Sequence, residues 1–338
     1  MRKPKIKVIP LDEKHQKLAK ILEEYYAIAH RELIEAIRFE IFNPDRDLRR
    51  RKKAYRDYGE VVFKLQPIFK KLATERNRLA NEDGYKNYFD FITTSDGIPK
   101  DKLELFFTKA DELIKEINQK LPLPPKNCKW YWSEFNIPDF LSLVSAPKFS
   151  LPKDIFKIAR KINPKFKEVI PKIKLIGKIK DFHPTTRYDK KNGTITIEAL
   201  LKPNIYNALT LVHELGHALS FWECLEKGVD LSTKSRYWKE KEAFRTLFEF
   251  EEFALPREVK NASQGQILGD FLTAFFEYEI YTNPNQDFDK LYAQAHNRCH
   301  PQSKQRKNPF YVLENNLVLS PCSVVTTSVA ETELLLKN

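Results

Sequence analysis

Residues 203–228 read PNIYNALTLVHELGHALSFWECLEKG, and this stretch decides the fold that we expect. Its residues are apolar on nearly every side of a helix, which predicts a buried helix rather than one at the surface. His213 and His217 are four positions apart, so both imidazoles project from the same side of this helix, one turn apart. Glu214 follows His213 directly and lies about 100° round the helix from it.

The spacing of these three polar residues indicates a metal site with its own general base. Two imidazoles on one side of a helix can converge on one ion, and Glu214 would flank that ion as the base for a water that it activates. The alternative is that both histidines are hydrogen-bonded core residues. Two observations favour the metal: the chain has only seven histidines, and it places Gly216 inside the helix at a cost of about 1 kcal/mol. A glycine there is explained if a neighbouring backbone or a substrate approaches closely. We expect one Zn²⁺ per chain.

A catalytic zinc needs a third protein ligand and one open position. No histidine lies between His217 and His296, so we expect a glutamate from the next helical segment, YWKEKEAFRTLFEFEEFAL at 237–255. Glu242 and Glu249 are seven positions apart on one face, so that one of them can bind the ion while the other holds a ligand histidine. The segment offers Glu240, Glu242, Glu249, Glu251 and Glu252.

The rest of the chain predicts a mainly helical protein. Glycine is scarce, with 9 residues in 338, and apolar residues recur at three- and four-residue spacing. Three prolines in LPLPPKN at 121–127 end a helix, and we place a boundary there between an N-terminal helical region, 1–125, and a catalytic region, 126–338. The expected helices lie at 11–42, 45–81, 100–120, 236–255, 264–281, 285–299 and 322–336.

A small sheet is expected just before the histidine helix. Asn192-Gly193 separates TTRY from TITI, and this pair is typical of the turn of a β-hairpin because both positions accept a positive φ. We expect residues 194–198 to form an edge of the sheet, beside which an extended substrate would add as a strand.

Composition limits the partners and the cellular compartment that we expect for the protein. The net charge of +12 fits an anionic partner, but no RNA-binding or zinc-finger signature accompanies it, so nucleic acid is not the expected partner. The run DRDLRRRKKAYRD at 45–57 is interpreted as a solvated helix face. Four cysteines without CxxC spacing favour a reducing cytoplasm. Neither a signal peptide nor a membrane span is expected, because no apolar stretch is long enough.

These motifs resemble the oligoendopeptidase F and thimet oligopeptidase family of zinc peptidases. HELGH at 213–217 corresponds to the family's HExGH, and EAFRTLFE at 242–249 resembles its later ExxSxxxE segment, with Phe244 and Arg245 in place of small residues. The resemblance implies a helical, zincin-like domain of the gluzincin type, with Glu242 as the third zinc ligand. This chain is shorter than typical members and lacks the glycine-rich loop that many of them have ahead of HExGH.

Three other stretches fit the same family in order. They are RNRLANEDGYKNYFDF at 76–91, FFEYEIY at 275–281 and NPFYVLENNLVLS at 308–320. The last resembles a segment that supplies a tyrosine hydroxyl to the tetrahedral intermediate. The resemblance therefore implies Tyr311 as an oxyanion donor, with His300 as a second candidate donor.

The predicted function is zinc-dependent hydrolysis of peptide bonds in oligopeptides, with His213, His217 and Glu242 as metal ligands and Glu214 as general base. Two alternatives remain. Taq-type zinc carboxypeptidases use the same motif with a distant glutamate, and a non-enzymatic, basic helical protein that binds RNA or another acidic partner would carry HELGH as a structural site. The oligomeric state does not follow from the sequence.

Overall fold

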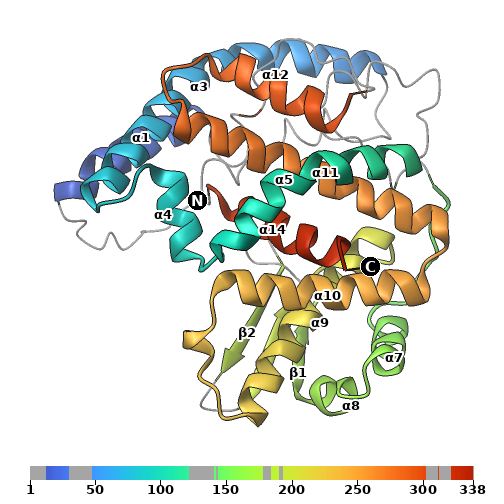
Figure 1. Cartoon of the computed structure of the whole chain (residues 1–338). Coiled ribbons are helices and arrows are strands. Elements are labelled where there is room, and N and C mark those ends of the chain that lie inside the picture. The colour runs from blue at the N-terminus through green and yellow to red at the C-terminus, as the bar shows by residue number, and fades with distance from the viewer. Residues whose placement is uncertain are drawn as a thin grey trace, which may run out of the picture. The chain divides into compact units, whose positions relative to one another are not determined.

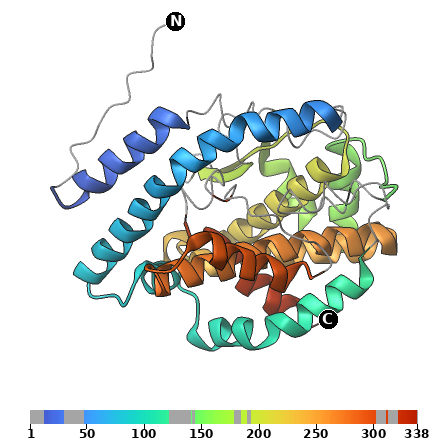
Figure 2. The ribbon, with the colours of Figure 1, turned by 90° about the horizontal axis from the view of Figure 1, so that it is seen from above.

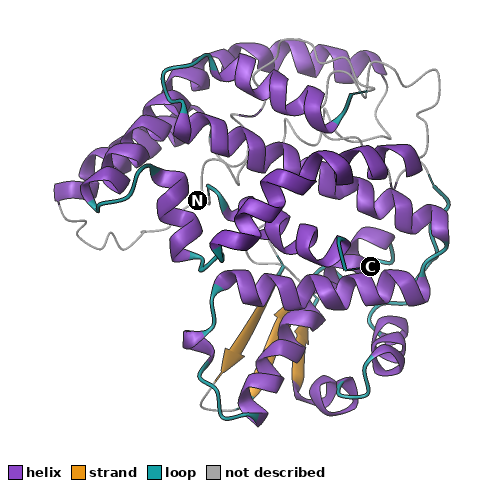
Figure 3. Ribbon diagram, viewed as in Figure 1, coloured by secondary structure: helices purple, strands orange, loops and turns teal. Residues whose placement is uncertain are grey.

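The computed structural model describes residues 13–29, 48–121, 141, 144–177, 184–189, 193–301, 311 and 321–337. It confirms the predicted fold class, since helices dominate and a single small sheet accompanies them in the described part of the chain (Figure 3). The chain divides into two compact units. Unit 1 takes the described residues up to Thr94 and those from Leu272 to Val324, and unit 2 takes the others. The predicted boundary between residues 125 and 126 lies outside the described residues and stays a prediction.

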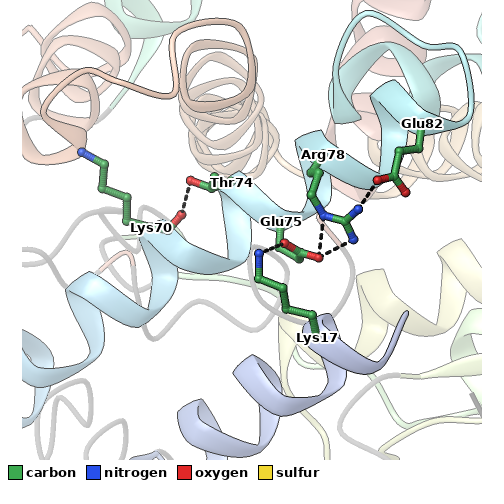
Figure 4. Close-up of polar contacts among 6 residues, drawn as sticks. All are labelled: Lys17, Lys70, Thr74, Glu75, Arg78 and Glu82. Atoms are coloured by element: carbon green, nitrogen blue, oxygen red, sulfur yellow. Dashed lines mark hydrogen bonds and ion pairs between the residues drawn. The ribbon is translucent and has the colours of Figure 1, made fainter. Parts of the chain in front are cut away.

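Unit 1 is helical. A buried carboxylate joins two of its described helices, α1 (Glu13–Ile28) and α3 (Leu48–Glu82). Glu75 of α3, only 2% exposed, forms ion pairs with Lys17 of α1 at 2.7 Å and with Arg78 at 2.6 Å (Figure 4). The Arg78 hydrogen bond lowers the pKa of Glu75 and outweighs the effect of burial. Helix α1 thus runs along α3 (Figure 2). The other elements that the structure describes in unit 1 are α4 (Tyr88–Ser95), α12 (Phe288–Cys299) and the second half of α11 (Arg257–Thr282).

Unit 2 combines the sheet with helices around it (Figure 1). Its longest helices, apart from its share of α11, are α9 (Ile205–Glu226), α5 (Lys100–Lys120) and α10 (Arg236–Ala254). It also contains nearly all of α14 (Ser323–Leu335). The smaller elements are α7 (Lys153–Ile162), α8 (Phe166–Val169), η3 (Ile170–Lys172), β1 (Ile173–Ile176), β2 (Thr185–Asp189), β3 (Thr194–Glu198) and η4 (Leu231–Thr233).

The sheet has the strand order β1-β3-β2. Strand β3 runs parallel to β1 and antiparallel to β2, with Asp189 opposite Thr194 and Thr185 opposite Glu198. The antiparallel pair confirms the predicted hairpin, and Gly193 has the positive φ, +59°, that its turn requires. However, β3 is the central strand, so the expectation that a substrate adds beside residues 194–198 is wrong. Both sides of β3 are already paired, and β2 and β1 are the edges.

Helix α9 is the predicted buried helix. At its start, the side chain of Asn204 accepts a hydrogen bond of 2.8 Å from the backbone N–H of Asn207. At its end, Gly228 takes a φ of +63°, and the N–H groups of Gly228 and Val229 donate to the carbonyls of Leu225 and Cys224. This pattern closes the helix as a Schellman motif does. Leu211, Leu215 and Ala218 are fully buried in the middle.

Helices α9 and α10 touch closely at Gly216. A Cβ on Gly216 would lie 2.7 Å from the Cα of Ala243 and 2.9 Å from its carbonyl oxygen. Such contacts are too short for any residue but glycine, which confirms the expectation that a neighbouring backbone approaches this position. The absence of a side chain therefore brings the two helices together at the level of the histidines.

The predicted helices are found largely where the sequence placed them. The segments expected at 100–120 and 236–255 form α5 and α10, and those expected at 285–299 and 322–336 form α12 and α14. The charged run at 45–57 lies in α3 from Leu48 on, but its side chains are outside the described residues. Within the described part of the chain, no helix is long and apolar enough to cross a membrane.

Candidate metal centre

Helices α9 and α10 bring two imidazoles and one carboxylate together in unit 2. His213, His217 and Glu240 each offer one ligand atom, and these atoms lie within 4.8 Å of one another. The Oε2 atom of Glu240 is 3.5 Å from Nε2 of His213 and 3.9 Å from Nε2 of His217. Ligand atoms about 2.0 Å from a tetrahedral zinc are separated by about 3.3 Å. Small rotations of these side chains would therefore bring the three ligand atoms to the distances that one zinc ion requires. The donor set therefore fits zinc.

The electrostatics of the three side chains suit a cation. Burial lowers the pKa of His217 to about 4, helped by the charge of His213. Burial opposes ionisation of Glu240, but the contact with His213 and the charges of both imidazoles outweigh it and lower its pKa to about 2. Burial also lowers the pKa of His213, and its contact with Glu240 more than reverses this. The site thus holds an ionised carboxylate beside two imidazoles, which is a donor set that a metal cation suits.

Glu242, the predicted third ligand, does not join this group. Its Oε2 atom binds Arg245 of the same helix at 2.5 Å. Residues two apart on a helix point about 200° away from each other, so Glu240 and Glu242 cannot face α9 together. Glu249, the alternative on the same face as Glu242, also lies outside the group, and burial raises its pKa. In the described structure Glu240, and not Glu242, therefore stands beside the two imidazoles.

Glu214 lies beside the metal group and is held by the sheet. The hydroxyl of Thr186, on β2, is 2.6 Å from Oε2 of Glu214 and 3.0 Å from its backbone carbonyl oxygen. Burial raises the pKa of Glu214, against the lowering effects of His213 and of the Thr186 hydrogen bond. A buried carboxylate with a raised pKa is suited to accept a proton and to return it. Sequence reasoning missed Thr186, because nothing in TTRY shows which residue faces α9.

Each of the two imidazoles lies against one phenylalanine ring. The ring of Phe244 lies 4.7 Å from that of His213, and the ring of Phe221 stacks on His217 at 6.3 Å. Phe244 stands where the resemblance places a small residue, so the large ring restricts the space on that side of His213. This packing limits the rotation of the candidate ligands.

Tyr311 and His300, the predicted oxyanion donors, belong to unit 1. Tyr311 is fully buried, and its hydroxyl donates to Oδ1 of Asp289 at 2.9 Å. Burial raises the pKa of Tyr311, whereas burial lowers the pKa of His300 to about 3. The metal group belongs to unit 2, so the roles of Tyr311 and His300 at the metal site stay predictions.

Comparisons with known proteins agree on the fold. No protein-family model matches the sequence, and no curated protein matches it. Three solved structures share the fold at 13% to 14% sequence identity. PZ peptidase A with inhibitor 2 has a TM-score of 0.63 and 14% identity, over 96% of this chain and 65% of that one.

The other two structures carry the name oligoendopeptidase F. One has a TM-score of 0.67 and 13% identity, over 94% of this chain and 65% of that one. The other, from Bacillus anthracis str. Ames, has a TM-score of 0.61 and 14% identity, over 94% of this chain and 63% of that one. This chain therefore has the fold of these helical proteins but spans less than two thirds of their length.

Proposed function

We propose that this chain is a zinc-dependent peptidase that hydrolyses peptide bonds in oligopeptides. His213, His217 and Glu240 would hold one zinc ion, and Glu214 would act as general base. The observation that carries the proposal is the position of the Glu240 carboxylate, 3.5 Å and 3.9 Å from the two imidazole nitrogens, beside a buried glutamate. The fold, which the chain shares with proteins named as peptidases, supports it.

Each residue of the candidate site has a separate role in the proposed hydrolysis. When bound, zinc supplies a Lewis acid that polarises the scissile carbonyl and makes water more acidic. Glu214 takes a proton from the attacking water as the water oxygen forms a C–O bond with the carbonyl carbon. The peptide C–N bond then breaks as Glu214 passes that proton to the leaving amine. Thr186 holds the Glu214 carboxylate in place while it does so. Glu240 adds the negative charge that balances part of the charge of the ion.

Metal content and hydrolysis test the proposal together. The purified protein is analysed for metals by mass spectrometry and incubated with a mixed peptide pool, whose products are identified in the same way. We expect about one zinc per chain and defined cleavage products. Glu214→Gln should keep the zinc and lose hydrolysis by at least about a hundredfold, because only the base is removed. Full turnover by this variant would rule out Glu214 as the base.

The third ligand is tested by a matched pair on one helix. Glu240→Gln should lose most of the zinc and with it the hydrolysis, because an amide oxygen is a weaker and uncharged ligand. Glu242→Gln makes the same change two residues away and should keep both properties. If Glu242→Gln empties the site and Glu240→Gln does not, the assignment of Glu240 as the third ligand is wrong.

Peptides blocked at the C-terminus separate endopeptidase from carboxypeptidase activity, because an endopeptidase cleaves them and a carboxypeptidase does not.

A further inference from the structure

A cavity of about 410 Å³ lies next to the candidate metal centre, within unit 2. His213 and Glu214 form part of its wall. Three further acids also line it: Glu251 from α10, Asp270 from α11 and Glu331 from α14. Its described lining contains no lysine or arginine, although the whole chain carries a net charge of +12. The cavity is therefore acidic in an otherwise basic protein.

Among the described residues that line this cavity, no lysine or arginine faces its acids; the charge of His213 on the wall acts on Asp270, and that of Lys260 outside the cavity acts on Glu251. Glu331 is only 2% exposed, and its Oε2 atom has no hydrogen-bond partner in the described structure. Glu251 is equally buried and accepts a hydrogen bond from the hydroxyl of Ser263, which is neutral. Buried carboxylates without a cation are unfavourable, so a cation that enters the cavity would be strongly attracted.

The protonation of the three acids agrees with this shortage of positive charge. Burial raises the pKa of Glu251 to about 7, against the lowering effects of the Ser263 hydrogen bond and the charge of Lys260. Burial also raises the pKa of Asp270 to about 7, against the charge of His213. Burial also raises the pKa of Glu331, and the negative charges of Asp270, Glu251 and Glu240 raise it further. Each acid is thus close enough to Glu331 to disfavour its ionisation. A ligand with a positive charge would relieve this repulsion and favour the ionised forms.

The spacing of the acids and the apolar residues in the lining favour an organic cation over a second metal ion. In the described structure these acids do not form a group of three ligand atoms within 4.8 Å, as the metal centre does. The wall also includes the apolar side chains of Phe244, Leu247 and Ile267, together with the neutral polar side chains of Thr210, Ser263, Gln264 and Gln266. Lysine and arginine side chains have an apolar stem and a charged end, and they pack in this way elsewhere in proteins.

We propose that this cavity binds a lysine or arginine side chain of the peptide substrate, next to the bond that is cleaved. The stem of the side chain contacts Phe244, Leu247 and Ile267, and its charged end pairs with Glu331 and Glu251. The proximity of the cavity to His213 and Glu214 places the recognised residue beside the scissile bond. This inference rests on the proposed peptidase function and adds a substrate class to it: peptides with basic residues.

Peptide pairs that differ only in charge test the inference. Each pair carries either arginine or citrulline at one position, because citrulline keeps the length and shape of arginine without its charge. We expect wild-type kcat/KM to be at least about tenfold higher for the arginine peptide at one position beside the cleaved bond. Glu331→Gln should reduce this ratio at least about fivefold, and Glu251→Gln should also reduce it. Glu258→Gln is the matched control, since Glu258 is exposed near the start of α11 and does not line the cavity.

Two measurements keep the inference separate from the proposed function. If the enzyme cleaves arginine and citrulline peptides equally, or if both cavity variants keep the full ratio, the inference is wrong and the peptidase function stands. If no peptide is cleaved, the function fails, and equilibrium binding of the same uncleaved peptides decides. Tighter binding of the arginine peptide that both Glu331→Gln and Glu251→Gln weaken supports the cavity as a cation site, and equal binding overturns it. Circular dichroism shows whether each variant is folded.

Discussion

At the scale of single residues, the geometry of the candidate base depends on one threonine. The hydroxyl of Thr186 has one proton and lies within hydrogen-bond distance of both the carboxylate and the backbone carbonyl of Glu214. Because it comes from β2, it ties the base to the sheet rather than to its own helix. Thr186 is thus a positioning residue that acts through Glu214.

Replacing this threonine tests the positioning role. Thr186→Val keeps the shape of the side chain but removes the hydroxyl, so we expect kcat to fall about tenfold, with zinc content and KM nearly unchanged. Thr186→Ser restores the hydroxyl and should recover most of kcat. Steady-state kinetics with one peptide and a metal assay provide the measurements. An unchanged kcat in the valine variant would show that Glu214 needs no support from the sheet.

Three of the candidate site residues could be predicted from the sequence alone, and the third ligand could not. The spacing of His213, Glu214 and His217 fixes their relative directions on any helix, so these positions could be predicted without a partner. The third ligand depends on which face of α10 meets α9. Glutamates occur on several sides of α10, and Glu240 differs from Glu242 by two positions, so the face could not be chosen from the pattern.

At the scale of elements, the metal centre depends on how closely two helices approach. Gly216 gives α10 a place to lie against α9, at the same level as the two histidines. The sequence indicated a close contact there but did not identify the partner. The same limit applies to the sheet: the hairpin could be predicted from Asn192-Gly193, but the pairing of β3 with β1 could not, because a parallel neighbour leaves no local signal.

A single methyl group tests this helix contact. Gly216→Ala places a Cβ 2.7 Å from the Cα of Ala243, so α10 must shift and carry Glu240 away from the histidines. We expect the free energy of unfolding to fall by about 1 to 3 kcal/mol and zinc affinity to fall at least about tenfold.

Chelator competition measures the affinity, and denaturant unfolding measures the stability. Gly177→Ala is the control, because a Cβ there meets only side-chain atoms of Leu201, Cδ1 at 3.2 Å and Cγ at 3.6 Å, and no backbone. Wild-type zinc affinity in Gly216→Ala would show that α10 does not need this contact to place Glu240.

At the scale of the whole molecule, one carboxylate joins segments that are far apart in the chain. Glu333 of α14 binds Lys241 of α10 at 2.8 Å and Lys337 at 2.7 Å, and it accepts a hydrogen bond from the hydroxyl of Tyr237. Burial alone would raise its pKa, but these partners outweigh burial and lower the pKa from 4.5 to about 2. Glu331, one of the acids of the cavity, lies two residues before it on α14.

The lowered pKa of Glu333 predicts part of the acid sensitivity of the fold. Since the folded state holds the ionised form more tightly, its stabilising effect is complete above about pH 4.5 and is lost as the pH falls towards about 2. Between pH 6 and pH 3, we expect wild type to lose about 1 to 3 kcal/mol more of its unfolding free energy than Glu333→Gln does. Urea titrations at both pH values measure the difference. Equal losses in the two proteins would remove Glu333 from the cause of acid unfolding.

The fold of the whole chain is shared with the three solved structures. Between 94% and 96% of this chain aligns with 63% to 65% of each of those chains. The acids of the cavity come from three helices, α10, α11 and α14. Only the folded chain shows that they line the same cavity. The sequence offered Glu251 only as one of five glutamates after HELGH, and no local pattern pointed to Asp270 or Glu331.

The division of the candidate ligands between two helices has a thermodynamic consequence. An ion held by His213 and His217 on one helix and by Glu240 on the next would act as a crosslink between α9 and α10. Its binding energy would then count towards the stability of unit 2, and by linkage every contact that keeps the helices together would count towards the affinity for the ion. Resistance to unfolding and retention of the metal would therefore be two measures of the same packing.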